Sequence, residues 1–264
     1  MRFTSDAVGM DVNAYLDRIG VARPGAADAE HLRELHRAHL EAVPFENLGI
    51  HLGEPISLDP DDLVDKVVRR RRGGFCYELN GAFALLLEAL GYSVARVGAR
   101  VFRTPDQLGP PFDHLALLVG TADHDGPWLA DVGFGRHSTY PLLLGSRTGQ
   151  DDPGGRFTLA DAPDGDVDVF RDGDPQYRIE ARPRALTDFA PTCWWQATSP
   201  ESHFTRAPVC SRLDGDARIS ISGRTLIRTK GGAREETPLP SDDALRAAYR
   251  EHFGITLDRL PGGA

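Results

Sequence analysis

The spacing of hydrophobic residues changes near Tyr92, and this change sets the order of the structural parts. Before it, apolar side chains recur three and four residues apart, as at Leu79, Phe83 and Leu86, which is the period of an α-helix with one buried face. After it come β-rich runs at residues 94–102, 114–119 and 128–132, separated by clusters of Pro, Gly and Asp. The chain is therefore expected to be an α+β protein, with helices first and a sheet or barrel after them.

Three helices are expected in the first ninety residues. Apolar positions share one helical face within residues 12–19, 32–40 and 79–90. Gly91 is placed to end the third helix.

The rest of the chain gives a weaker pattern. Residues 145–174 are rich in Gly, Asp and Pro, which is compatible with a mobile loop or with a hairpin. A strand pair is expected at residues 217–222 and 224–229. A helix should follow at about residues 242–252, with Ser241 as its N-cap.

Composition narrows the classes of function. A chain of 264 residues is long enough for two or three hydrophobic cores. The net charge of −9 provides no positive field for a nucleic-acid backbone or an anionic membrane. No apolar run approaches the ~20 residues of a membrane helix, and residues 1–20 lack the apolar centre of a signal peptide. We expect a cytoplasmic protein that binds neither nucleic acid nor membrane.

The three cysteines are odd in number and widely spaced. Cys76, Cys193 and Cys210 therefore predict neither a disulfide framework nor a metal clip. Reduced thiols are expected, and Cys193 and Cys210, with no recognisable base beside them, are expected to be unreactive.

Cys76 has the surroundings of a nucleophile. Gly73 and Gly74 let the backbone turn tightly, so that Cys76 comes to the N-terminus of the helix expected over residues 79–90. The helix dipole, or a neighbouring imidazolium, stabilises a thiolate there. From its position alone, a buried structural cysteine is an equally good interpretation. The choice depends on what lies nearby.

His114 and Asp131 are the candidate partners of Cys76. His114 opens one β-rich run and Asp131 lies near the end of the next. If the two strands form a hairpin centred near Ala122 and Asp123, the two residues face each other with Cβ atoms about 4.5–5.5 Å apart. A carboxylate could then bind one imidazole nitrogen and leave the other free. A lone histidine at a strand start is more often structural, but the coincidence of all three residue types favours a Cys-His-Asp triad.

Several segments together resemble the arylamine N-acetyltransferases. The hallmark Arg-Gly-Gly-Phe-Cys of that family is matched at residues 72–76, and its histidine and aspartate follow 38 and then 17 residues later, as His114 and Asp131 do. Further matches are Val-Pro-Phe-Glu-Asn-Leu at residues 43–48, Asp-Val-Gly-Phe-Gly at 131–135 and, more weakly, Ser-His-Phe at 202–204. The last sixty residues contain little that matches the motifs of this family.

The resemblance implies a fold and an activity. The fold would be a helical bundle at residues 1–92, a β-barrel at 93–202 and an α/β lid at 203–264, with a cysteine-protease-like triad held by bundle and barrel. The activity would be transfer of acetyl from acetyl-CoA to an arylamine, arylhydroxylamine or hydrazine. It would proceed by a ping-pong cycle through acetyl-Cys76, without a metal. A small-molecule acceptor would be the partner, and the oligomeric state is left open.

The resemblance also implies roles for residues around the triad. Glu46 would pair with Arg71 and brace the loop that presents the cysteine. The predicted coenzyme contacts are Phe112, Gly133 and Phe204, and the predicted acceptor contacts are Phe45 and Phe134. His137 is expected at the surface, and the arginines of residues 69–72 are interpreted as a solvated face more readily than as a phosphate site.

Three other functions are compatible with the triad residues. A macrolactam-forming amide synthase would use the same triad in a much larger pocket. A thiol hydrolase or transglutaminase-like enzyme is possible because triads recur on unrelated folds. A catalytically silent binding protein would not need all three residue types.

Overall fold

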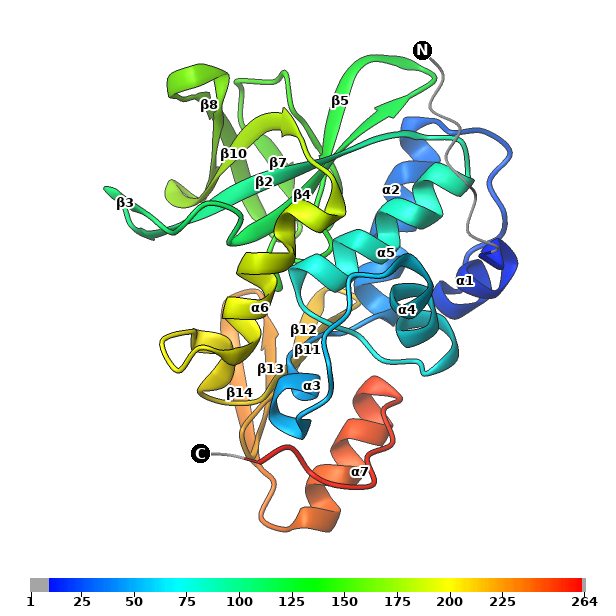
Figure 1. The fold of residues 1–264 in the computed structure, drawn as a ribbon, viewed down its shortest axis with the longest axis vertical. Helices are drawn as coiled ribbons and strands as arrows, with labels where there is room; N and C mark the ends of the chain where they lie inside the picture. The colour runs from blue at the N-terminus through cyan, green and yellow to red at the C-terminus, as the bar shows by residue number, and fades with distance from the viewer. Residues whose placement is uncertain (1–9, 263–264) are drawn as a thin grey trace.

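The computed structural model describes residues 10–262 and contains a helical part, two antiparallel sheets and a C-terminal helix (Figure 1). The helical part comprises α1 (Val12–Ile19), α2 (Ala29–Ala42), α3 (Leu48–Leu52), α4 (Pro60–Val64), a π-helical turn at Asp65–Arg69, and α5 (Cys76–Ala89). The later helices are α6 (Ala190–Thr198) and α7 (Asp242–Phe253), with 3-10 turns at Pro163–Gly165, Leu186–Phe189 and His203–Thr205.

The expected helices are confirmed, with their caps. The Asp28 carboxylate accepts from the N–H of His31 at 2.9 Å to begin α2, and the Ser241 hydroxyl accepts from Ala244 at 3.1 Å to begin α7. Gly91 has a φ of +92° just after α5, a left-handed conformation that glycine adopts at low cost. Among residues 10–262, every helix is too short or too polar to span a lipid bilayer.

The larger sheet is a nearly closed barrel. Its strands are β2 (Ser93–Thr104), β3 (Gln107–Leu108), β4 (His114–Thr121), β5 (His124–Ala130), β6 (Leu142–Leu143), β7 (Gln150–Asp152), β8 (Gly155–Asp161), β9 (Val167–Arg171) and β10 (Asp174–Pro183). The order is β6-β5-β4-β2-β10-β9-β8-β7, with β3 on β2. The Gln150 side chain of β7 accepts from Leu143 N of β6 at 2.8 Å and donates to Leu143 O at 3.1 Å. The two end strands are therefore linked.

Residues 145–174 form hairpins. β7 pairs with β8, and β8 pairs with β9, both antiparallel. Alternate side chains of these strands, such as Phe157, Leu159 and Val169, are buried in the barrel core with Tyr177 of β10. Of the two interpretations left open for this segment, the hairpin is the right one.

The β4–β5 hairpin has the expected turn but not the expected register. Thr121 pairs with His124 around Ala122 and Asp123, but an irregularity between Val119 and Thr121 shifts the rest of the pairing. Leu117 then faces Ala130, so Asp131 is level with residue 116 and not with His114. The prediction that His114 and Asp131 face each other directly was wrong.

The smaller sheet joins distant parts of the chain. Its strands are β1 (Phe45–Glu46), β11 (Val209–Asp214), β12 (Ala217–Ser222), β13 (Thr225–Lys230) and β14 (Ala233–Pro238), which confirms the strand pair expected near residues 217–229. β1 pairs with β11 in the order β1-β11-β12-β13-β14, and α7 contributes Tyr249 and Phe253 to the core beside Ile219 and Ile221. The division of the chain into a helical bundle, a barrel and a lid at residues 92 and 202 stays a prediction.

The residues that the sequence predicts as the reaction centre lie where these parts meet. In Figure 1 the N-terminal helices lie beside the barrel strands, and α6 runs from the barrel toward the smaller sheet. One buried cluster combines Phe75 and Cys76 of α5's start with Leu115 of β4, Cys193 of α6 and Phe204. Side chains from the helical part, the barrel and the later segments can therefore converge on one place.

Candidate active site

Two glycines bring the start of α5 against the Pro44–Glu46 segment. A Cβ on Gly73 would lie 1.7 Å from the carbonyl oxygen of Pro44, so only glycine fits there. The N–H of Glu46 donates to the carbonyl of Gly74 at 2.8 Å, and Phe45 and Gly74 form a parallel bridge. The two sequence motifs at residues 43–48 and 72–76 therefore lie side by side and position Cys76.

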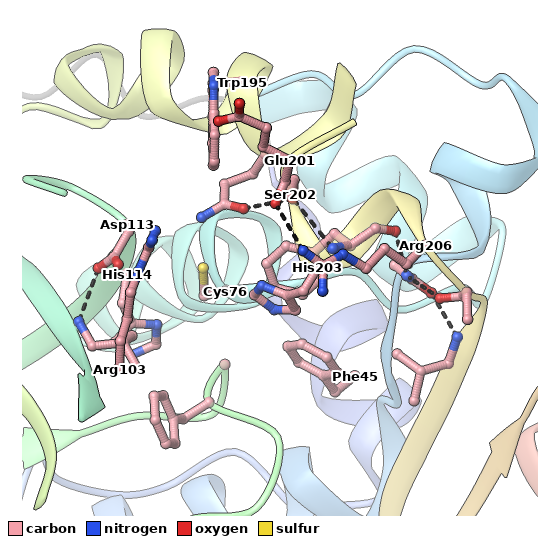
Figure 2. A pocket seen from close by; sticks show the side chains of 18 residues that line it. Phe45, Cys76, Arg103, Asp113, His114, Trp195, Glu201, Ser202, His203 and Arg206 are labelled. Carbon is pink, nitrogen blue, oxygen red and sulfur yellow. Dashed lines mark hydrogen bonds between the residues drawn. The ribbon is translucent and has the colours of Figure 1, made fainter. Parts of the chain in front are cut away.

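The N-terminus of α5 is held by a buried ion pair. The Glu78 carboxylate accepts from the N–H of Phe75 at 3.2 Å and from Lys66 Nζ at 2.5 Å. Cys76 is the first residue of α5, so its N–H has no acceptor within the helix. Figure 2 shows the Cys76 sulfur directed into a cavity.

Arg72, and not Arg71, pairs with Glu46. Arg72 Nε donates to Glu46 Oε1 at 2.9 Å, and Arg72 Nη1 donates to Glu54 Oε2 at 3.3 Å. The N–H of Leu48 donates to Glu46 Oε2 at 2.6 Å. Burial raises the pKa of Glu46, but nearby Lys66 and Arg72 outweigh it and the net shift is downward. Arg71 is exposed with a φ of +51°. The prediction was wrong by one residue because the turn directs successive side chains to opposite sides.

His114 and Asp131 meet despite the shifted register. His114 Nε2 donates to Asp131 Oδ2 at 2.8 Å, so Nδ1 is the ring nitrogen left for Cys76. Burial lowers the pKa of His114, but the Asp131 charge and hydrogen bond and a hydrogen bond with Cys76 raise it to about 10. Burial raises the pKa of Asp131, but the His114 charge and hydrogen bond hold it well below its usual range. The imidazolium is thus stabilised at neutral pH.

Three further groups orient the Asp131 carboxylate. Asn80 Nδ2 and the N–H of Gly133 donate to Oδ1 at 2.8 and 3.0 Å, and the Tyr177 hydroxyl donates to Oδ2 at 3.0 Å. Sequence reasoning missed Asn80 and Tyr177. The role of Asn80 could have been predicted from the sequence, because Asn80 lies one helical turn after Cys76 and shares its face of α5. Tyr177 gave no signal, since only the barrel brings β10 beside Asp131.

Two buried histidines form an outer layer. His36 Nδ1 donates to the carbonyl of Thr139 at 2.9 Å, which leaves Nε2 to accept the N–H of Asp131 at 3.1 Å. The Tyr177 hydroxyl gives its one proton to Asp131, so His137 Nε2 donates to that hydroxyl at 2.9 Å. Burial lowers the pKa of His137 to about 4. His137 is therefore neutral and buried, and the prediction of a surface histidine was wrong.

The cavity beside Cys76 has a volume of about 620 Å³ and a wall that combines aromatic rings with charged and polar side chains. Phe45, Phe134 and Phe204 line it together with Gly133 and His114. The Phe134 ring meets His114 edge-on at 5.1 Å between centroids. These positions are compatible with the roles predicted for all four residues around the triad, which stay predictions.

Phe112 lies elsewhere. Phe112 is not one of the residues in the described part of the chain that line the cavity. Its ring packs on Phe189 at 5.3 Å between centroids, and the Arg184 guanidinium lies over the ring at 4.9 Å from its centroid. Its carbonyl accepts the Tyr77 hydroxyl at 2.8 Å. The structure thus gives Phe112 a packing environment, and its predicted coenzyme contact stays a prediction. Within residues 10–262, no group of three or more His, Cys, Asp or Glu is arranged to hold a metal ion.

Comparisons with known proteins agree with this geometry. The chain matches the N-acetyltransferase family over residues 28–260. It is 34% identical to the arylamine N-acetyltransferase of Mycolicibacterium smegmatis over 97% of this chain and 95% of that protein, and 32% identical to that of Escherichia coli K12 over 96% and 91%. The solved structure of the Mycobacterium marinum arylamine N-acetyltransferase covers 93% of both chains at 35% identity with a TM-score of 0.86. The chain therefore belongs to the arylamine N-acetyltransferase family.

Proposed function

We propose that this protein moves an acetyl group from acetyl-CoA to the nitrogen of an arylamine, arylhydroxylamine or hydrazine by way of a thioester on Cys76. The observation that carries the proposal is the convergence of the Cys76 sulfur, the His114–Asp131 hydrogen bond and a cavity with several aromatic rings at one point. An arylamine ring needs an aromatic wall, and an acyl transfer needs a nucleophile with a proton carrier. This cavity has both.

The first half-reaction forms the acetyl-enzyme. The Cys76 thiolate attacks the thioester carbonyl and forms a new C–S bond, and the bond to the coenzyme sulfur breaks as His114 Nδ1 gives that sulfur its proton. The N–H of Cys76, at the helix N-terminus, is one donor for the transient oxyanion. Asp131 keeps its proton-free form and holds the imidazole in place.

The second half-reaction consumes the acetyl-enzyme. The acceptor nitrogen attacks the acetyl carbonyl, His114 Nδ1 takes the nitrogen's proton, and the bond to Cys76 breaks to restore the thiolate and imidazolium. Both half-reactions use the same cavity, so the coenzyme thiol must leave before the amine docks. This order is a ping-pong cycle.

The mouth of the cavity suits the acyl donor. The chain carries a net charge of −9, but basic side chains line this cavity, namely Arg103, His203 and Arg206. Figure 2 shows Arg103 on one side of Cys76, with His203 and Arg206 on the other. Guanidinium groups bind phosphates well. A solved structure of the Mycobacterium marinum relative is a complex with CoA. We assign these side chains to the coenzyme's phosphate-bearing part.

The cavity volume favours a small acceptor. About 620 Å³ lies within the usual range for drug-sized ligands, which suits an arylamine better than the long chain of an amide-synthase substrate. We place the protein in the cytoplasm, because its three cysteines are free and disulfides are rare in that compartment.

The test is release of coenzyme thiol from acetyl-CoA across a panel of arylamines, arylhydroxylamines and hydrazines. Turnover should require an acceptor and vanish in Cys76→Ala. Cys193→Ala and Cys210→Ala are matched controls that should retain it, because burial raises the pKa of both thiols. Turnover with none of the acceptors would contradict the proposed acceptor class. Peptide cleavage without coenzyme would favour the hydrolase.

A further inference from the structure

We propose that Gln196 is a hydrogen-bond donor of the acceptor site and selects arylamines whose ring carries a hydrogen-bond-accepting oxygen, such as a ketone or carboxamide. The inference rests on the proposed function and names its substrate class more narrowly. Gln196 lies on α6 and is only 4% exposed, yet it lines the same cavity as Cys76 and Phe134. Its Nε2 is not among the fully buried polar atoms of residues 10–262 that lack a hydrogen-bond partner, so it is open to the cavity, and a ligand that displaces water there must replace the lost hydrogen bond or bind less tightly.

The orientation of this amide follows from its neighbour. Ser202 is 1% exposed, and its hydroxyl oxygen accepts the N–H of Phe204 at 3.2 Å. The Ser202 proton is then free to donate to Gln196 Oε1, which lies 2.7 Å away. The amide nitrogen, Nε2, consequently points away from Ser202. It donates to no side chain or carbonyl among residues 10–262, so its two N–H groups are available to a ligand.

The amide belongs to the reaction centre and not to the outer surface of α6. Cys193, one turn earlier on the same helix face, packs in one cluster with Cys76, whereas Trp194 on the opposite face is 68% exposed. In Figure 2, Trp195 and Ser202 lie on one side of the cavity and Phe45 on the other, with the Cys76 sulfur between them. A ring held between these walls would cover the Gln196 amide.

The amide then discriminates by polarity. A ring oxygen that reaches Nε2 gains a hydrogen bond in a site shielded from water. An alkyl group of the same shape expels water from Nε2 and leaves its N–H groups unpaired. A site built around a polar partner rejects the analogue that lacks it far more strongly than an apolar site rejects an extra methyl group. The neutral amide makes this selection without requiring a charged substrate.

The test compares aminoacetophenones with isopropylanilines, as meta and para isomers, in the wild type, Gln196→Met and Gln196→Glu. Both variants remove the amide N–H donors, and the second, assayed at a pH where its carboxyl group is ionised, keeps an oxygen for Ser202. For at least one isomer, we expect kcat/KM with the ketone to fall about tenfold in both variants, with the isopropyl analogue unchanged or improved. The kcat/KM of each acceptor in a variant is divided by its kcat/KM in the wild type, so the effect of the ketone on the reactivity of the amine cancels. Trp194→Ala, on the same helix, is the control and should leave the ratio unchanged.

Acetylation of Cys76 by acetyl-CoA without acceptor is measured on the same preparations. Normal acetylation with a changed ketone-to-isopropyl ratio supports the inference. An unchanged ratio for both isomers overturns it, and so does slower acetylation with an unchanged ratio, since the amide would then act on the acyl donor. Failure of the wild type to acetylate Cys76 at all would contradict the proposed function itself. If Gln196→Met does not fold, Gln196→Glu decides the question.

Discussion

Gly133 packs so closely on Cys76 that a Cβ at position 133 would lie 2.8 Å from the Cys76 Cα. The same added atom would lie 2.7 Å from Asn80 Nδ2, the atom that donates to Asp131 Oδ1. The loop that follows Asp131 thus touches the backbone of Cys76 directly. The spacing between Cys76 and the other residues of the proposed triad depends on this contact.

Gly133→Ala should therefore disturb the triad more than it disturbs the fold. The added methyl group must push the loop away from α5, and misplacement of catalytic groups by about 1 Å can cost about 100-fold in rate. We expect a fall in turnover of at least about tenfold. Gly145→Ala, where nothing lies within 4 Å of the added Cβ, is the matched control. Equal turnover in the two variants would contradict the role given to the contact.

Replacing Arg72 should destabilise the protein, whereas replacing its neighbour should not. Arg72→Ala leaves the Glu46 carboxylate buried without its closest cation, and breaking such a pair typically costs about 3–5 kcal/mol. Arg71→Ala removes an exposed side chain and should change the free energy of unfolding by less than about 0.5 kcal/mol. Urea unfolding of both variants measures the difference. The reverse order of stability would restore Arg71 as the partner of Glu46.

Asp131→Asn should leave the chain folded but lower turnover by about 1,000-fold or more, because an amide neither stabilises the imidazolium nor holds the tautomer. Alkylation of Cys76 by iodoacetamide near neutral pH should slow as well. As a control for folding, the circular dichroism spectrum of the variant should match that of the wild type. Alkylation at the wild-type rate would mean that Asp131 does not support the His114 charge.

Asp131→Asn should also show how the contribution of the His114–Asp131 pair to the free energy of unfolding depends on pH. Because the pKa of His114 is raised from 6.5 to about 10, the pair's contribution is fully present below pH 6.5 and is lost as the pH rises toward 10. Because the pKa of Asp131 is lowered from 3.8, the contribution is present above pH 3.8 and is lost below it. The wild-type and variant free energies of unfolding should therefore differ most between pH 3.8 and 6.5. A difference that grows above pH 6.5 would contradict this assignment.

Phe134→Ser should change acceptor selectivity more than chemistry. The ring lines the cavity, and an aromatic contact is worth about 0.5–1.5 kcal/mol beyond its buried area, so unsubstituted arylamines should weaken by roughly tenfold or less. Bulkier acceptors should gain from the space. Rapid-mix acetylation of Cys76 should be nearly unchanged, with Phe134→Leu as a control of similar volume. Slow acetylation with an unaltered preference among arylamines would instead assign the ring to the coenzyme site or the core.

Local patterns predicted helices α1, α2, α5 and α7, several of the strands, and the three residues that we propose as a triad, but not the short helices α3 and α4 or helix α6. Helix α5, its end at Gly91 and the N-cap Ser241 follow from period and capping chemistry within a few neighbouring residues. The His114–Asp131 contact was predicted for a partly wrong reason, because an irregularity between Val119 and Thr121 shifts the strand pairing. The contact survives because the side chains span the offset. Strand irregularities depend on packing and leave little trace in sequence.

Features that depend on long-range packing were missed. Tyr177 and His36 meet Asp131 only after the barrel closes and α2 packs on it, and their own segments carry no catalytic pattern. Arg72 and Arg71 are adjacent and chemically identical, so only the left-handed turn at Arg71 decides which one is buried. The coenzyme contact predicted for Phe112 stays a prediction, and its ring packs on Phe189.

The most direct test of the central proposal is the mass of the protein after incubation with acetyl-CoA in the absence of any acceptor. Because His114 activates the Cys76 thiol at the cavity, one acetyl group should be gained and peptide mapping should locate it on Cys76. Addition of an arylamine should then remove it and yield the N-acetyl product. An acetyl group found on Cys193 or Cys210, or full turnover by Cys76→Ala, would contradict the account.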